Sequence, residues 1–135
     1  MRYAPYPDEY ASVADMGNAQ LLEYFLTRIF ETEEVWVLDD GIEWLLDERG
    51  ERLCMPVWPY KKYAAECAIA EWGHYTPAGL SLEVFMQQAL ELLTEEDAVL
   101  EVMPRPGAVG CTIRPSQLIS ILEGMIDAGE YRMDG

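Results

Sequence analysis

The stretch 35-VWVLDDGIEWLLDERGERLCMPVWP-59 decides the fold class, because strand-like runs alternate in it with turn signals. Residues 35–38 are rich in valine and tryptophan, and Asp40-Gly41 is a hairpin signal that leads into a second such run at residues 42–46. Residues 47–50 predict another turn, and residues 53–57 predict a third strand. This order predicts a three-stranded antiparallel meander.

On both sides of this stretch, apolar residues recur at helical spacing, with Asn18 and Ser81 as expected N-caps. A second pair of strand-like runs, at residues 99–103 and 111–113, flanks a turn and predicts a hairpin. The sequence therefore predicts an α+β fold, in which an antiparallel sheet of about five strands, the meander plus the hairpin, is covered by about four helices. The predicted helices comprise residues 18–29, 59–72, 81–93 and 115–126.

The length of 135 residues fits one domain. Residues 1–17 carry tyrosines among prolines and acids without helical or strand periodicity, so they predict an extended N-terminal arm. Residues 18–130 form the predicted single α+β domain, with Gly129 as the expected end of the last helix, and residues 131–135 form a C-terminal tail. Residues from three of the helices are expected to share one core: Phe25, Leu26, Ile29, Phe85, Leu122 and Met125.

The charge of the chain is strongly acidic. Twenty-five Asp and Glu residues against nine Lys and Arg residues give a formal net charge of −16. Such a charge repels phosphate groups and anionic lipids, so neither nucleic acid nor a membrane surface is expected as a partner. The same charge attracts a basic protein and speeds the encounter with it, although it also serves solubility. The hydrophobic half of the composition, which includes four tryptophans, excludes a disordered acidic tail.

The cysteines, Cys54, Cys67 and Cys111, lie far apart in the sequence. No CxxC motif or Cys/His cluster accompanies them, so the sequence predicts neither a zinc site nor a disulfide framework. Free cysteines in apolar stretches indicate a reducing compartment. The first residues show no apolar signal region, and no run of about 18 apolar residues occurs. We therefore expect a cytoplasmic protein.

Several of these phrases, taken in order and spacing, resemble the bacterial family catalogued as domain of unknown function 2750. The segment Pro56-Val57-Trp58-Pro59, followed by a predicted helix, is the sharpest of them. The resemblance covers about residues 19–126 and implies a single-domain bacterial protein, without an established reaction, cofactor or catalytic residue. The other matching phrases are residues 35–38 with Asp40-Gly41 and Trp44, Leu82 with Phe85, residues 99–104, and Pro115 with Leu118.

Catalytic chemistry finds no support in the motifs. His74 is the only histidine, and its place just past a predicted helix end favours a structural or solvated role. No Gly-x-Ser-x-Gly elbow, GxxxxGK[ST] or GxGxxG is present, and Ser81 and Ser116 stand where helix caps belong. We expect no catalytic residue, no metal site and no cofactor.

The densest acidic run of the chain, residues 31–52, also contains Trp36 and Trp44. Aromatic residues surrounded by charge are typical of interface hot spots. This run predicts a surface, here called the acidic lip, that binds a basic protein partner. Other interpretations remain open, because tryptophans in strands often belong to the core and charges often protect a sheet edge, while hard cations such as magnesium also favour carboxylates. The predicted partner-binding residues are Trp36, Asp39, Asp40, Glu43, Trp44, Asp47 and Glu48.

The leading functional hypothesis is thus a non-catalytic acidic interaction protein, one form of which is an immunity or inhibitor protein that masks a basic toxin. The first alternative is a small-ligand-binding or catalytic protein with a cleft between the Trp58 segment and the third predicted helix. The second alternative is a structural subunit that forms a homodimer through the N-terminal arm and exposed helix faces.

Overall fold

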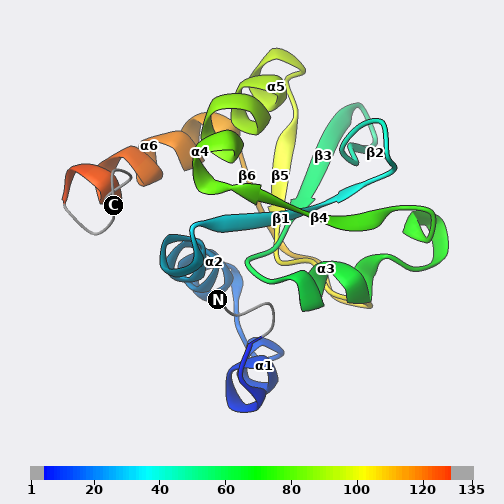
Figure 1. Ribbon diagram of the computed structural model, residues 1–135, viewed down its shortest axis with the longest axis horizontal. Helices are drawn as coiled ribbons and strands as arrows, with labels where there is room; N and C mark the ends of the chain where they lie inside the picture. Colours follow the sequence, from blue (N-terminus) through cyan, green and yellow to red (C-terminus); the bar gives the residue numbers. More distant parts are fainter. Residues whose placement is uncertain (1–4, 129–135) are drawn as a thin grey trace.

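Two small β-sheets form the centre of the fold, and helices pack around them, so the α+β class is confirmed (Figure 1). The computed structural model describes residues 5–128. The strands are β1 (Glu34–Asp39), β2 (Asp47–Arg49), β3 (Arg52–Val57), β4 (Thr76–Ser81), β5 (Val99–Val102) and β6 (Cys111–Ile113). The helices are α1 (Pro7–Val13), α2 (Asn18–Thr32), α3 (Lys61–Cys67), the 3₁₀ turn η1 (Ala70–Trp72), α4 (Leu82–Val84), the π-helical turn η2 (Phe85–Ala89), α5 (Leu90–Glu95) and α6 (Pro115–Asp127).

The strand order differs from the predicted meander. One sheet contains only β1 and β4, which pair antiparallel, and the other has the order β2-β3-β5-β6. In the second sheet β3 and β5 run parallel, whereas the outer pairs are antiparallel. The prediction of an entirely antiparallel sheet is therefore wrong. A parallel pair needs a long crossover, and here α3, β4 and the helix that includes α4 and α5 lie between the two strands.

The predicted middle strand of the meander, residues 42–46, is a loop that makes a single bridge, between Asp39 and Trp44. Asp side chains explain this loop, because they bind the backbone donors that a ladder would use. The Oδ1 atom of Asp39 accepts a hydrogen bond from the Gly41 N–H at 2.6 Å. The Oδ1 atom of Asp40 accepts from the N–H groups of residues 42 and 43, both at 2.9 Å.

The partner of β1 is β4, whose residues lie between two predicted helices and were not predicted to form a strand. Its Pro77 and Gly79 are residues that strands usually avoid. Gly79 has a packing reason, because a Cβ atom there would lie 3.1 Å from the indole ring of Trp36. The close approach of the ring to the backbone thus favours glycine in this strand, because a Cβ atom would require the ring to move by a few tenths of an ångström.

The N-terminal segment is also different from its prediction. Residues 7–13 form α1, with Pro7 at the start and Asp8 and Glu9 in the first turn, where acids suit the helix dipole. The predicted extended arm is therefore wrong for the described part of the segment. The next helix begins at Asn18, but its N-cap is Gly17. Gly129 and the predicted tail at residues 131–135 lie outside the described residues.

The predicted third helix is confirmed, and its Ser81 cap accepts a hydrogen bond from the Val84 N–H at 3.1 Å. Its middle contains a π-helical turn, in which the N–H of Leu90 binds the carbonyl of Phe85. The additional residue in this turn shifts the helical register, so that Phe85, Ala89 and Leu90 are all buried. α5 then packs against α6.

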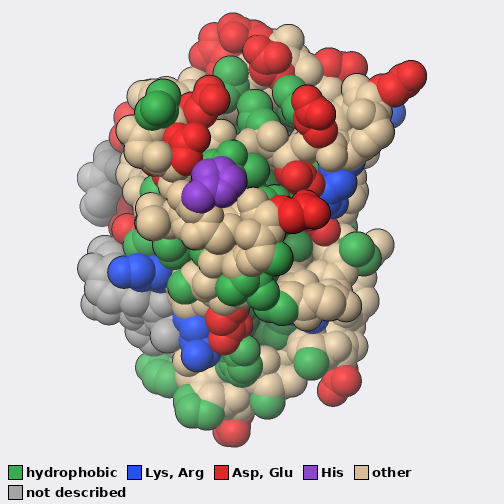
Figure 2. Space-filling model, turned by 90° about the vertical axis from the view of Figure 1, so that its right-hand side faces the viewer, with side chains coloured by type: hydrophobic (Ala, Val, Ile, Leu, Met, Phe, Trp, Pro, Cys, Tyr) green, Lys and Arg blue, Asp and Glu red, His purple; other side chains and the backbone are tan. Residues whose placement is uncertain are grey.

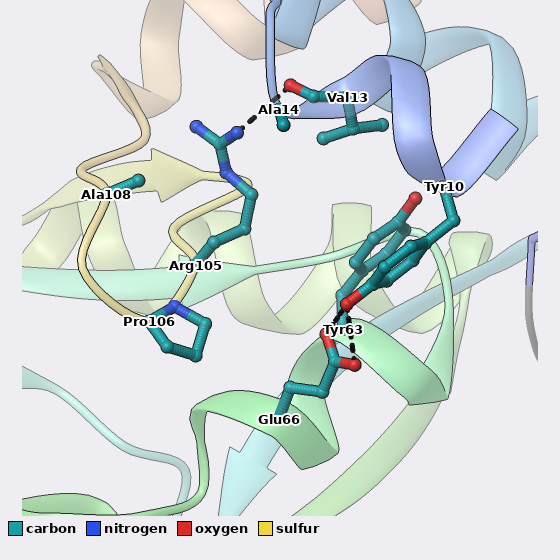
Figure 3. Close-up of a pocket in the computed structure, with 8 residues that line it drawn as sticks. All are labelled: Tyr10, Val13, Ala14, Tyr63, Glu66, Arg105, Pro106 and Ala108. Atoms are coloured by element: carbon teal, nitrogen blue, oxygen red, sulfur yellow. Dashed lines mark hydrogen bonds between the residues drawn. The ribbon is translucent and has the colours of Figure 1, made fainter. Parts of the chain in front are cut away.

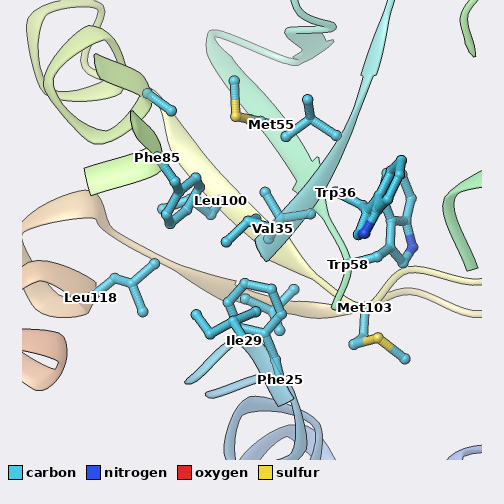
Figure 4. Packing of buried hydrophobic residues seen from close by; sticks show 14 of the residues in the cluster. Phe25, Ile29, Val35, Trp36, Met55, Trp58, Phe85, Leu100, Met103 and Leu118 are labelled. Atoms are coloured by element: carbon cyan, nitrogen blue, oxygen red, sulfur yellow. The ribbon is translucent and has the colours of Figure 1, made fainter. Parts of the chain in front are cut away.

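One hydrophobic core joins α2, both sheets and this helix, as Figure 4 shows around Phe25, Ile29 and Phe85. The expected core residues belong to it, except that Met125 packs on it while only partly buried. Trp58 at the end of β3 is completely buried on the other side of the same core. No helix within residues 5–128 combines the length and the apolar character that crossing a membrane requires.

The first prediction concerns this core. Replacing the fully buried Phe85 by Ala should lower the free energy of unfolding by about 3–5 kcal/mol, because a cavity replaces the ring. Urea unfolding followed by tryptophan fluorescence measures the change. Gln88→Ala, at an exposed position of the same π-helical turn, is the control and should stay within about 0.5 kcal/mol of the native chain. Equal effects of the two substitutions would contradict the assigned core face.

Candidate functional site

Three of the predicted lip residues come together at a surface hollow of about 540 Å³. Asp39 lines it from the end of β1, and Glu43 and Trp44 line it from the loop that follows. Leu92 of α5 and Glu96, the C-cap of that helix, line the other side. Ile42 and Leu46 complete the lining, and the Ile42 side chain is 90% exposed. We call this cavity the lip hollow.

The carboxylates at the lip hollow are not neutralised within the described chain. Glu43 and Glu96 are exposed, and neither forms a salt bridge with any residue of 5–128. Beside them, the backbone N–H groups of Glu43 and Ile42 donate to Asp40 and lower the pKa of its carboxyl group. Asp40 therefore stays ionised at neutral pH, and the loop presents an uncompensated negative charge.

Trp36 does not contribute to this surface. Its side chain is only 8% exposed, because the indole packs over Gly79 and its backbone pairs with Trp58. Trp44, by contrast, is partly exposed and lines the lip hollow. Trp44 is therefore the one predicted tryptophan that a partner could contact at the lip hollow.

The remaining lip residues, Asp47 and Glu48, lie on β2 and line a different part of the surface. Asp47 has partners within the chain, since its Oδ2 atom pairs with Arg49 Nε at 2.7 Å and its Oδ1 atom lies 3.5 Å from Trp72 Nε1. Glu48 is exposed. Asp47 therefore has a structural role, and only Glu48 of this pair is free of a described partner. Figure 2 shows one face of the molecule, on which acidic side chains gather in the upper half around the single histidine.

A second cavity, of about 360 Å³, contains polar residues that were not among the predicted site residues. Its wall includes Glu101, which is only 2% exposed although it is charged. The Oε1 atom of Glu101 accepts from Arg49 Nη2 at 2.7 Å, and its Oε2 atom accepts from the Gly110 N–H at 2.8 Å. The signal in the sequence was an acid inside the apolar run of β5, where every neighbour is buried. We call this cavity the Glu101 cavity.

A third cavity, of about 550 Å³, lies between α1, α3 and the loop after β5 (Figure 3). Tyr10 of α1 stacks on Tyr63 with ring centroids 5.6 Å apart, and its hydroxyl lies 2.8 Å from both carboxylate oxygens of Glu66. Arg105 Nη1 donates to the carbonyl of Val13 at 3.0 Å. The residues at this cavity thus hold α1 against the domain.

The cysteines are poorly suited to nucleophilic chemistry. Burial raises the pKa of Cys54 to about 11, and burial likewise raises the pKa of Cys67 to about 11. Burial also raises the pKa of Cys111, which is only partly buried. All three therefore remain thiols at neutral pH, whereas nucleophilic attack needs a thiolate. His74 is exposed, and the centroid of its ring lies 4.3 Å from the centroid of the Tyr75 ring.

At the place expected for a cleft beside the third predicted helix, the Trp58 side chain packs into the core. Trp58 is completely buried, and its Nε1 atom donates to the carbonyl of Pro104 at 2.7 Å. The side chain therefore lines none of the three cavities described above. Within residues 5–128, no group of three or more His, Cys, Asp and Glu residues is arranged to hold a metal ion.

The chain matches the model of a known protein family. The model of the family described as "Protein of unknown function (DUF2750)" matches residues 22–122, which include both sheets and most of the helices. The matched range contains the lip hollow and the Glu101 cavity, whereas α1 precedes it. No curated protein matches the chain.

The second prediction concerns the thiols. Cys111 should react with a thiol reagent such as DTNB at pH 8 about tenfold or more faster than Cys54 and Cys67, because only Cys111 is partly exposed. The Cys111→Ser variant should lose the fast phase, and a fast phase that persists in it would contradict the assigned burial.

Since the folded-state pKa values of the two buried thiols rise from 9.0 to about 11, their contribution to stability is complete below pH 9 and is lost as the pH rises through 11.

Proposed function

The chain belongs to the DUF2750 family of proteins of unknown function, and we propose that it is a non-catalytic interaction protein whose acidic lip binds a basic protein partner. One observation carries the proposal. The lip hollow combines carboxylates that lack a described cationic partner with the partly exposed ring of Trp44. A binding surface of this kind fits a residue that is both cationic and partly apolar.

The best candidate for such a residue is an arginine or lysine of the partner. Its aliphatic stem would pack on Ile42 and Leu92, while its charged end meets Glu43 or Glu96. An arginine would in addition stack on Trp44, since guanidinium groups favour aromatic faces. The hollow also lies at the C-terminal end of α5, where the helix dipole favours a cation.

The charge of the whole chain acts in the same direction. A net charge of −16 speeds the approach of a basic partner from a distance, and the lip hollow then selects the contact. Figure 2 shows acidic side chains gathered over the upper half of one face of the molecule. In one form of this function the protein is an immunity or inhibitor protein that masks a basic toxin in the cytoplasm.

The third prediction tests this proposal with a partner captured from the native cell on the tagged protein and identified by mass spectrometry. The double reversal Glu43→Lys with Glu96→Lys should slow association with that partner by about tenfold or more, because it inverts the charge at the hollow. Stopped-flow or surface plasmon resonance measurements give the rate. The association rate of the native chain should fall steeply as salt rises.

The matched control reverses Glu123 and Asp127 on α6, which are exposed and lie away from the hollow. This variant changes the net charge by the same amount, so it separates the local site from the overall charge. It should slow association much less than the lip variant. An acidic partner, or an equal loss of rate in the two variants, would show that the lip has no specific role.

A further inference from the structure

We propose that the Glu101 cavity is a binding site for a small, uncharged planar ring that carries an amide. This site is separate from the lip hollow, and the two cavities share no lining residue. The inference therefore goes beyond the proposed function. It rests on the polar groups of the cavity, its apolar walls and its charge balance.

The polar part of the cavity offers a hydrogen-bond donor beside an acceptor. Arg49 donates a hydrogen bond from Nε to Asp47 and another from Nη2 to Glu101. Its Nη1 group has no hydrogen bond within residues 5–128. Each oxygen of Glu101 accepts one hydrogen bond and can accept another. An amide matches this pair, because its carbonyl accepts from Arg49 while its N–H donates to Glu101.

The apolar part of the cavity favours a flat ligand. Trp72 lines one side, and its Nε1 contact with Asp47 at 3.5 Å orients the indole. Ile69 and Val109 also line the cavity and are 55% and 80% exposed, although large apolar side chains are usually covered. A volume of about 360 Å³ lies within the range of small-molecule sites. A ring between these walls would cover the exposed apolar surface.

The charges at the cavity cancel, which decides against a charged ligand. Arg49 and Arg105 line it with positive charge, whereas Glu101 and the adjoining Asp47 carry negative charge. Arg49 is firmly held in its charged form, because its hydrogen bond to Glu101 raises its pKa. A net anion or cation thus gains no excess of opposite charge here, and a neutral ligand loses less hydration on entry.

The backbone around the cavity is built for a fixed shape. Met103 and Ala70 adopt left-handed φ values of 62° and 54°, a conformation that costs energy in residues other than glycine and often occurs at binding sites. At Gly110 a Cβ atom would lie 2.3 Å from the Val102 carbonyl oxygen, so only glycine can present its N–H to Glu101. The carboxylate is therefore held in one place before any ligand arrives.

Three probes of equal shape test the inference: benzamide, benzoate and benzamidine, which are neutral, negative and positive. In ¹H–¹⁵N NMR titrations, benzamide should shift the amide signals of residues 69–72, 105 and 107–110 with a millimolar dissociation constant. The dissociation constants of benzoate and benzamidine should each be at least about tenfold higher than that of benzamide. Absence of benzamide shifts in these segments, or equal binding of the three probes, would overturn the proposal.

Variants assign the site within the same experiment. Trp72→Leu should weaken benzamide binding about fivefold or more, because it removes the aromatic wall. Trp44→Leu is the matched control, since it removes a partly buried tryptophan from the lip hollow and should leave benzamide binding unchanged. If Trp72→Leu does not fold, Trp72→Phe keeps a ring and should bind within about threefold of the native chain. Equal binding by Trp72→Leu and the native chain would overturn the proposal, whatever the outcome for the lip.

Discussion

The rest of the structure depends on the way Trp58 joins the two sheets. Its backbone exchanges two hydrogen bonds with Trp36 of β1, at 2.8 and 3.0 Å, where the two sheets would otherwise be separate. Its indole then donates to the Pro104 carbonyl at the end of the β5 region. Figure 4 shows the two tryptophans side by side at one end of the core. One residue thus connects β1, β3 and the loop after β5 through groups that are shielded from water and must be paired.

The loop that Trp58 holds separates two of the cavities. Arg105, Pro106 and Ala108 line both the cavity beside α1 and the Glu101 cavity. The loop is a tight turn, in which the N–H groups of Arg105 and Ala108 bind the carbonyls of each other at 2.9 Å. Because the Cys67 thiol also donates to Pro104, α3 is connected to the same point. Any shift of Trp58 would therefore move the walls of both cavities.

The acidic residues serve two different physical purposes. Glu101 and Asp47 are compensated by Arg49 and determine local geometry, as buried or partly buried charges must. Glu43 and Glu96 remain exposed at the lip hollow, where water hydrates their carboxylates. Their negative charge therefore remains available to attract cations over a distance. The two groups could not be told apart by composition, because each Asp or Glu contributes the same charge to a sequence count.

The sequence by itself determined the α+β class, the α2 and α6 helices, the Ser81-capped helix, and the grouping of Asp39, Glu43 and Trp44 on one part of the surface. Periodicity, caps and turn residues act over a few neighbours, so they are readable without a partner. Only the tertiary structure decided that β1 pairs with β4, that β3 and β5 are parallel, and that Glu101 is buried against Arg49. Strand pairing and the burial of a charge depend on residues distant in sequence, such as Arg49 and Glu101, which are 52 positions apart. The apolar run of β5 marks Glu101 as unusual but does not name its partner, because only the assembled fold brings Arg49 within hydrogen-bond distance to offset the cost of burying the charge.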